Sequence, residues 1–478
     1  MVRLRFAPSP TGYLHIGGLR TALFCWLYAR KNGGKFIFRL EDTDQKRIYE
    51  GAENNLATTL EWSGIEIDEG PQYGGKHGPY RQSERLDIYG KYTSLLLEEG
   101  NAYRCFCTSE RLEKLRNEQR KKGNNPRYDG FCRNISKLEA SRRVESGEDY
   151  VVRMKIPDVP ETMVLNDLIR GIVSIDTSQS EDQVIVKSDG FPTYHLAVVI
   201  DDYLMKITHV VRGEEWIPSF PKHLLLYRYF GWDPPQFAHL PLILNPDRTK
   251  LSKRQGDVAV EDFKNNGFLP ESLLNFVAML GWSPREDKEL FTLPELVREF
   301  SLERVNKSGA IFDQEKLKWM NQQYIQKLEL DDLQDRLNPF IKKSRYSGKD
   351  PKILRKIIKI LQPRLVTLSE IEDRLPLFFE NNPKASNPKV LKVLGEEISK
   401  QVLTNFIKQA ESVEKLTKNN LVELMKKVQN ETKIKGKNLW IPLRYAITLD
   451  TEGPDLNLIV DFFGKEKCLH LARSALKF

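Results

Sequence analysis

The strongest constraint on the fold is a segment close to the N-terminus. Residues 5–18 read RFAPSPTGYLHIGG, which is an apolar run, a proline-rich turn and a glycine pair. The apolar run at residues 2–6 predicts a strand, residues 17–31 have a helical pattern, and residues 35–40 predict a second strand. A strand, helix, strand unit of this kind begins a parallel, doubly wound sheet. We therefore expect an α/β domain at the start of the chain.

The glycine pair that opens the predicted helix suits a nucleotide. Gly17 and Gly18 allow close approach to the backbone, while the N–H groups and the dipole at a helix N-terminus attract phosphate. His15 can then donate a hydrogen bond to phosphate oxygens. A histidine before two glycines is also common as a surface residue in a turn. The prediction therefore rests on the whole segment.

Composition narrows the class of protein. A chain of 478 residues is long enough for about three domains, and its formal net charge of +8 favours an acidic partner such as nucleic acid. No signal peptide is evident and no apolar run approaches about 18 residues, so we expect a cytoplasmic protein without a membrane span. The five cysteines are an odd number and argue against a disulfide framework.

Changes along the chain indicate its organisation. A cysteine-containing, charged segment interrupts the first domain from about residue 102, and helical stripes such as residues 353–361 dominate beyond residue 325. We predict a Rossmann-like α/β catalytic domain with an inserted α+β domain, followed by an all-α C-terminal region. The predicted boundaries are 1–101 and 183–245 for the two catalytic halves, 102–182 for the insertion, 246–325 for a subdomain and 326–478 for the helical region.

A second motif follows in residues 250–254, which read KLSKR. Together with HIGG at residues 15–18, this motif resembles the two signatures of class I aminoacyl-tRNA synthetases, in the form of the glutamate and glutamine branch. The family writes HIGH and KMSKS at these points. The resemblance implies ATP with Mg²⁺ as substrate, catalytic roles for His15, Lys250 and Lys253, and ATP contacts from His15, Gly17, Gly18, Glu215, Lys250, Leu251, Ser252, Lys253 and Arg254.

Three further blocks concern the amino acid. Residues 39–44 (RLEDTD), 188–197 (SDGFPTYHLA) and 211–216 (VRGEEW) resemble blocks of glutamyl-tRNA synthetases. The resemblance implies that Glu41 holds the substrate ammonium, that Arg5 and Arg212 hold its carboxylates, and that Ser9 and Tyr194 complete the pocket. Arginine matches carboxylate well, although each of these residues read singly could be an ordinary surface charge. Val198 departs from the family, where many members carry Asn.

The insertion contains a cysteine pattern. Cys105, Cys107 and Cys132 resemble the zinc-bearing insertion of some glutamyl-tRNA synthetases, which often supply a histidine as the fourth ligand where this chain has Asn134. Structural zinc is bound tetrahedrally by four ligands. The three cysteines therefore leave its coordination shell incomplete unless Tyr128 or a more distant group supplies the fourth ligand. A decayed site without Zn²⁺ is the preferred expectation, and a zinc site is the alternative.

The resemblance extends from residue 3 to residue 448 and implies glutamate–tRNA ligase activity, with glutamate tRNA, L-glutamate and ATP as partners of a monomer. It also implies that Arg364 contacts the anticodon. Two other functions stay open: a glutamyl-transferring tRNA-modification paralogue, which would resemble only the catalytic half, and a non-catalytic tRNA-binding protein, which would be expected to lack His15, Lys253 or Glu41. The glutaminyl branch is disfavoured by residues 41–44 and by the helical C-terminal pattern.

Overall fold

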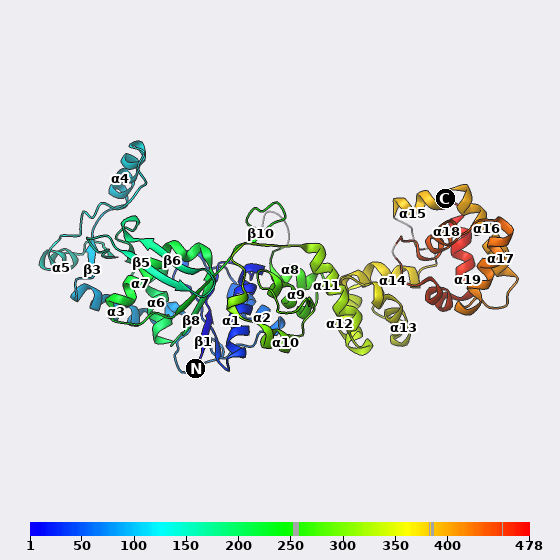
Figure 1. The fold of residues 1–478 in the computed structure, drawn as a ribbon, viewed down its shortest axis with the longest axis horizontal. Coiled ribbons are helices and arrows are strands. Elements are labelled where there is room, and N and C mark those ends of the chain that lie inside the picture. The colour runs from blue at the N-terminus through cyan, green and yellow to red at the C-terminus, as the bar shows by residue number, and fades with distance from the viewer. Residues whose placement is uncertain (252–257, 382, 384–386, 452) are drawn as a thin grey trace. The chain divides into compact units, whose positions relative to one another are not determined.

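The chain divides into two compact units. The computed structural model describes residues 1–478 apart from 252–257, 382, 384–386 and 452 (Figure 1). The first unit comprises residues 1–262 and 273–313, and the second comprises residues 263–272 and 314–478. Among the residues described, no helix is both long enough and apolar enough to cross a membrane.

A six-stranded sheet organises the first unit. Its order is β2-β1-β8-β9-β5-β6, and every neighbouring pair is parallel except the β5/β6 hairpin. The strands are β1 (Arg3–Phe6), β2 (Lys35–Phe38), β5 (Thr162–Asp167), β6 (Gly171–Asp176), β8 (His209–Gly213) and β9 (Gln236–Leu240). All four residues of β1 are buried, as expected for a central parallel strand covered on both faces.

The predicted strand, helix, strand unit is confirmed. Strand β1 leads through the proline-rich turn into helix α1 (Ile16–Lys31), and the chain returns in β2 parallel to β1, with Arg5 opposite Ile37. Arg30 and Lys31 in the last turn of α1 complement the helix dipole. This arrangement leaves the N-terminal end of α1 beside the carboxyl end of β1.

Helices and a short β pair complete the first part of the chain. A large apolar cluster joins β4 (Val151–Met154), β5, α6 (Tyr194–Leu204) and α7 (Phe220–Tyr229). The elements are α2 (Ala52–Trp62), α3 (Leu86–Glu98), α6 (Tyr194–Leu204), α7 (Phe220–Tyr229), α8 (Val260–Asn265), α9 (Pro270–Met279), α10 (Leu293–Glu299), β10 (Ile243–Leu244) and β11 (Ala310–Ile311).

Residues 102–182 contribute to two sheets. Strands β3 (Ala102–Cys105) and β4 (Val151–Met154) pair with β7 (Val184–Val186) in a separate antiparallel sheet, accompanied by helices α4 (Ser109–Lys121) and α5 (Lys137–Glu145). Strand β5, in contrast, joins the main sheet, with Asp167 opposite Phe237 of β9. The segment therefore extends the main sheet as well as forming an α+β lobe.

The second unit is helical where it is described. The predicted stripe at residues 421–428 packs inward through Leu421, Leu424, Met425 and Val428, all of which are buried. The helices beyond α10 are α11 (Gln314–Lys327), α12 (Leu330–Lys343), α13 (Pro351–Leu361), α14 (Ile371–Phe379), α15 (Pro388–Leu394), α16 (Glu397–Glu411), α17 (Lys418–Thr432), α18 (Lys437–Thr448) and α19 (Leu456–Ala475). The predicted fold class is confirmed: an α/β sheet, an inserted α+β lobe and an all-α C-terminal region.

Candidate active site

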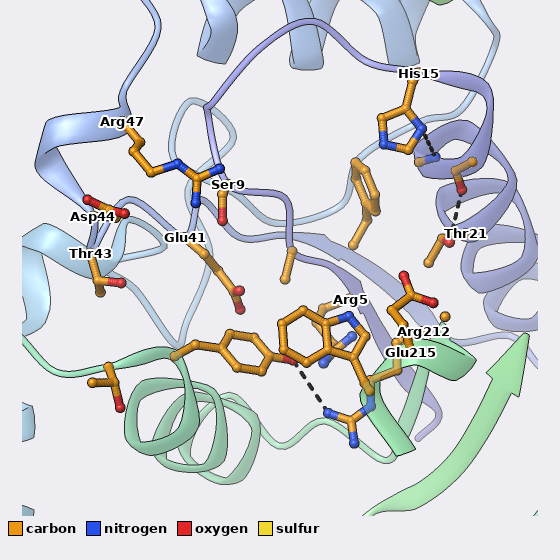
Figure 2. A pocket seen from close by; sticks show the side chains of 18 of the residues that line it. Arg5, Ser9, His15, Thr21, Glu41, Thr43, Asp44, Arg47, Arg212 and Glu215 are labelled. Carbon is orange, nitrogen blue, oxygen red and sulfur yellow. Dashed lines mark hydrogen bonds between the residues drawn. The ribbon is translucent and has the colours of Figure 1, made fainter. Parts of the chain in front are cut away.

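One large cavity of about 1190 Å³ opens at the carboxyl ends of β1 and β8 and at the start of α1. Ligand sites of open α/β sheets lie at such strand ends. Figure 2 shows Arg5, Glu41 and Arg212 gathered around the same space, with His15 at the start of α1. Of the predicted site residues, the cavity is lined by Arg5, Ser9, His15, Gly17, Gly18, Glu41, Tyr194, Arg212, Glu215, Lys250 and Leu251.

His15 caps the helix that faces the cavity. Its Nδ1 accepts a hydrogen bond from the Gly18 N–H at 3.1 Å. In the neutral ring the proton is therefore on Nε2. A β-carbon added at Gly18 would lie 2.9 Å from Leu14 Cδ1, so any larger residue there would displace the end of the Leu14 side chain. The exposed His15 ring and the first N–H groups of α1 lie at the cavity, and a helix N-terminus of this kind is suited to an anion.

Arg5 and Glu41 belong to a chain of buried charges. Arg5 Nε donates to Asp202 Oδ1 at 3.0 Å, and Arg39 donates to Asp202 at 2.7 Å and to Glu41 at 3.0 Å. Burial raises the pKa of Glu41, against the opposing charges of Arg39 and Arg5. The pKa of Asp202 is lowered because Arg5 and Arg39 together outweigh the effect of burial. Asp202 thus fixes both guanidinium groups, of which that of Arg5 lines the cavity.

Asp202 was missed in the sequence interpretation, although a signal was present. Asp201 and Asp202 directly follow the apolar run of residues 196–200 in helix α6, and both are buried. Acidic residues are almost never fully buried unless they are paired, so two acids on an apolar helix indicate buried partners. Asp201 accepts from Arg85 Nε at 2.7 Å and from the Tyr89 hydroxyl at 2.9 Å.

Arg212 lies at the end of β8 and is 5% exposed. Its Nη1 donates to the Tyr194 hydroxyl at 3.4 Å, and Tyr194 packs against Trp216 with ring centroids 4.3 Å apart. Arg212 Nη2 is buried and has no hydrogen-bond partner among the residues that the structure describes. An unsatisfied donor on a buried guanidinium lining a cavity favours an anionic ligand, because leaving it unpaired costs about 1–3 kcal/mol.

The other residues that were predicted to contact ATP, and that the structure describes, lie in two turns. A β-carbon at Gly213 would lie 2.1 Å from Glu215 Oε2, so glycine allows the Glu215 side chain to fold back beside β8. Lys250 follows a tight turn closed by the Asn245 N–H to Thr249 carbonyl bond of 2.8 Å, and its side chain is exposed at the cavity. The predicted ATP contacts Ser252, Lys253 and Arg254 lie outside the described residues.

Two other residues that the sequence singled out are not among those lining this cavity. Arg364 is exposed in a short 3₁₀ turn (Gln362–Arg364) of the second unit. Val198 is buried in α6, 2% exposed, and does not line the cavity.

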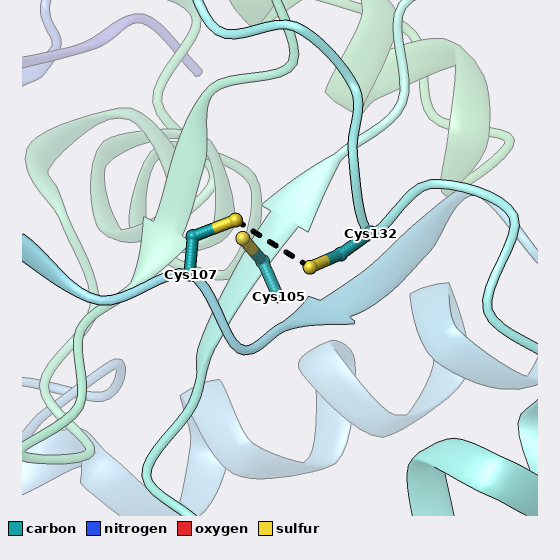
Figure 3. Close-up of side chains that lie close together, drawn as sticks. All are labelled: Cys105, Cys107 and Cys132. Carbon is teal, nitrogen blue, oxygen red and sulfur yellow. Dashed lines mark hydrogen bonds between the residues drawn. The ribbon is translucent and has the colours of Figure 1, made fainter. Parts of the chain in front are cut away.

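The three cysteines of the insertion converge (Figure 3). Their sulfur atoms all lie within 4.8 Å of one another, and Cys107 Sγ is 3.6 Å from Cys132 Sγ. The Tyr128 hydroxyl lies 3.4 Å from Cys105 Sγ and 3.7 Å from Cys107 Sγ. Asn134, at the expected position of the fourth ligand, is exposed. Of the two residues considered for the fourth ligand, Tyr128 is therefore the one whose side-chain oxygen is recorded beside the sulfurs.

Comparisons with known proteins identify one family over nearly the whole length of the chain. Residues 1–319 match the family model for class I tRNA synthetases (E and Q), catalytic domain, and residues 332–474 match an anticodon binding domain. The chain is 46% identical to the glutamate–tRNA ligase of Clostridioides difficile and 45% identical to that of Bacillus subtilis, with 98% of both chains covered in each case.

Solved structures agree as well. A crystal structure of a glutamate tRNA ligase from Elizabethkingia meningosepticum, in complex with its amino acid, superposes with a TM-score of 0.87 and 37% sequence identity. The match covers 100% of this chain and 99% of that one. A glutamate-tRNA synthetase structure from Elizabethkingia anophelis gives a TM-score of 0.85.

Proposed function

Since this chain belongs to the glutamate–tRNA ligase family of class I aminoacyl-tRNA synthetases, we propose that it activates L-glutamate with ATP and transfers it to the 3′-terminal adenosine of its tRNA. The family resemblance read from the motifs is confirmed. The observation that carries the assignment is the single cavity lined by the helix-capping His15, the buried Glu41 and the buried Arg212. These groups match the phosphates, the ammonium and a carboxylate of the two substrates.

In the first step, the α-carboxylate of glutamate attacks the α-phosphate of MgATP, and pyrophosphate leaves. Negative charge grows on phosphate oxygens in the transition state. We assign its stabilisation to His15, the N-terminus of α1, Lys250 and Lys253. In the second step, a hydroxyl of the terminal adenosine attacks the adenylate carbonyl, and AMP leaves. Both steps need positioning and charge neutralisation, and neither needs a protein nucleophile.

Within the glutamate subsite, Glu41 pairs with the ammonium, and Arg5 and Arg212 face the two carboxylates. Ser9 and Tyr194 complete its walls. Arg5 already pairs with Asp202, whereas Arg212 has an unsatisfied Nη2, so Arg212 is the better partner for the side-chain carboxylate. A substrate ammonium beside Glu41 would also offset the burial that raises the pKa of this carboxyl.

Neither alternative function is supported. A tRNA-modification paralogue would match only the catalytic half, but the relatives cover 98% of the chain and the second unit matches an anticodon binding domain. A non-catalytic protein would be expected to have lost substrate-binding groups, yet His15 and Glu41 both line the cavity.

Charging of glutamate tRNA by the purified chain, with ATP and labelled glutamate, tests the function. Absence of any charged tRNA would refute it.

The anticodon contact of Arg364 is a further part of the proposal. It rests on the exposed side chain in a helical unit that matches an anticodon binding domain. Arg364→Ala should lower the preference for cognate tRNA over a transcript with a changed anticodon by about tenfold, the cost typical of losing an arginine–base contact. The matched control, Lys352→Ala, removes an exposed charge in α13. It should weaken the binding of the cognate tRNA and of the changed transcript equally. Equal effects of the two variants would exclude base reading by Arg364.

The cysteine cluster fits zinc better than the sequence suggested. Tetrahedral Zn²⁺ with Zn–S bonds of about 2.3 Å holds its sulfurs nearly 4 Å apart, close to the 3.6 Å between Cys107 and Cys132. Tyr128 supplies an oxygen beside the sulfurs. Arg111 Nη1 lies 3.5 Å from Cys107 Sγ, and the Arg153 guanidinium lies 3.8 Å from the centre of the Tyr128 ring. Such cations would balance a thiolate-rich site.

We therefore expect about one zinc per purified chain, held by Cys105, Cys107, Cys132 and Tyr128. Mass-spectrometric metal analysis should show its loss in Cys132→Ala and faster loss to a chelator in Tyr128→Phe. The control Cys468→Ala, at a buried thiol of the second unit, should retain the metal. Wild-type protein that stays zinc-free after incubation with Zn²⁺ would support the decayed site instead.

A further inference from the structure

Three neighbouring strands hold Arg212 through a row of buried side chains. Arg212 of β8 and His239 of β9 are directly opposite in the parallel register, and Arg212 Nε lies 3.0 Å from His239 Nε2. Asp167 ends β5, the next strand, and its Oδ2 lies 2.6 Å from His239 Nδ1. Asp167 is itself fixed by the N–H groups of Ile169 and Arg170, at 2.9 and 2.8 Å.

This row sets the tautomer of His239. Asp167 has a lowered pKa, because hydrogen bonds from His239 and from the backbone outweigh burial, and it accepts a hydrogen bond from His239 Nδ1. The Nε2 atom is then left with a lone pair, which accepts from Arg212 Nε. Burial lowers the pKa of His239 despite the carboxylate of Asp167. The imidazole therefore stays neutral and acts as an acceptor toward Arg212.

A second histidine holds the other side of the guanidinium. His223 of α7 is 1% exposed, and its Nδ1 lies 3.1 Å from Arg212 Nη1. Because Nδ1 accepts there, His223 carries its proton on Nε2, which donates to His195 Nδ1 at 3.0 Å. Burial and the charge of Arg212 push the pKa of His223 well below its ordinary value. Both histidines are thus neutral acceptors.

The result is a guanidinium whose orientation is fixed and whose charge is not cancelled. Its Nε donates to His239 and its Nη1 to His223 and Tyr194, while Nη2 alone lacks a partner among the described residues. No carboxylate of the described part of the chain forms an ion pair with Arg212, whereas Arg5 is paired with Asp202. Since the Tyr194 hydroxyl accepts from Arg212, its proton remains available for a ligand. Neutral acceptors keep the full positive charge for a bound anion.

We propose that His239 and His223 are positioning residues that set the preference of this site for glutamate over glutamine. The inference rests on the proposed function and adds the residues that act through Arg212. Histidine is suited to this role because a carboxylate in the same place would neutralise Arg212 and remove its preference for an anion. Asp167 acts one step further away, by keeping the proton on His239 Nδ1.

Paired substitutions can test the tautomers directly. A glutamine amide reaches the position of imidazole Nε2, and an asparagine amide reaches that of Nδ1. His239→Gln therefore keeps an acceptor for Arg212, whereas His239→Asn keeps only the bond toward Asp167. At His223 the pattern reverses, because Arg212 contacts Nδ1 there: His223→Asn keeps the acceptor and His223→Gln loses it.

The measurement is steady-state tRNA charging with glutamate and with glutamine, including the KM for ATP. We expect His239→Asn and His223→Gln to raise the glutamate KM by about tenfold or more. The same two variants should reduce the preference for glutamate over glutamine. Their KM for ATP should stay within about twofold of the wild-type value. His239→Gln and His223→Asn should keep the glutamate KM within about threefold. His209→Asn is the matched control. This histidine lies on β8, the strand of Arg212, but contacts Thr208 and Tyr28 instead of Arg212.

Equal effects of Asn and Gln at both positions, or the opposite pattern, would overturn the inference while leaving the proposed function intact. Parallel losses for ATP and glutamate would also overturn it, because they would indicate a general structural role. Wild-type protein that charges no glutamate would instead overturn the proposed function, and the inference with it. The two histidines give independent pairs, so one variant that fails to fold does not remove the test.

Discussion

Arg212→Ala should raise the glutamate requirement by about thirtyfold or more, because removing one partner of a buried charge pair costs about 2–5 kcal/mol. The ATP requirement should barely change, since the guanidinium is held between Tyr194, His223 and His239 and none of these belongs to the HIGG or KLSKR motifs. Glutamine is neutral at the end of its side chain, so its weak activation should be much less affected. A site built around one specific polar partner rejects the mismatch without a second editing site.

The measurement is amino-acid-dependent ATP–pyrophosphate exchange for wild type and variant with both amino acids. Arg228→Ala is a suitable control, because this exposed arginine of α7 pairs with Glu161 at the surface, where ion pairs contribute little. Equal losses for glutamate and glutamine, or no loss for glutamate, would show that Arg212 lies outside the specificity pocket.

Asp202→Ala should lower the free energy of unfolding by about 3–5 kcal/mol, the cost of leaving buried charges without their partner. Arg5 and Arg39 both donate to this carboxylate, and their side chains are 5% and 0% exposed. Because the folded pKa of Asp202 is lowered, its stabilisation is complete above the ordinary aspartate pKa. That stabilisation is lost as the pH falls through the folded value.

Urea unfolding followed by circular dichroism would measure this loss. Asp158→Ala provides the comparison, since Asp158 pairs with Arg133 but its side chain is 89% exposed. This substitution should lower the free energy of unfolding by less than about 1 kcal/mol. A loss of that small size for Asp202→Ala would mean that the buried arginines find other partners. Asp202 would then not be the residue that holds Arg5 and Arg39 in place.

Local sequence patterns predicted much of this fold. The β1-α1-β2 unit follows from signals within one short segment: apolar runs, a proline-rich turn and a glycine pair. The helices of the second unit follow from apolar stripes of helical period, such as residues 421–428. These elements depend on neighbouring residues, so the sequence is sufficient to predict them.

The partners of the site residues could not be predicted in the same way. The bonds of Asp167 to His239 and of His239 to Arg212 depend on the strand order β8-β9-β5, and β5 lies inside a segment that reads as an insertion. Asp202 reaches Arg5 across nearly two hundred residues of sequence. Motif resemblance indicated which residues share the cavity but not what orients them.

The most direct test of the function is pyrophosphate exchange by the intact wild-type chain, run with glutamate or glutamine and with or without glutamate tRNA. We predict glutamate-dependent exchange in the presence of the tRNA, little exchange with glutamine, and transfer of glutamate to the 3′ end of that tRNA. Exchange that prefers glutamine, or no exchange with glutamate under any of these conditions, would contradict the assignment.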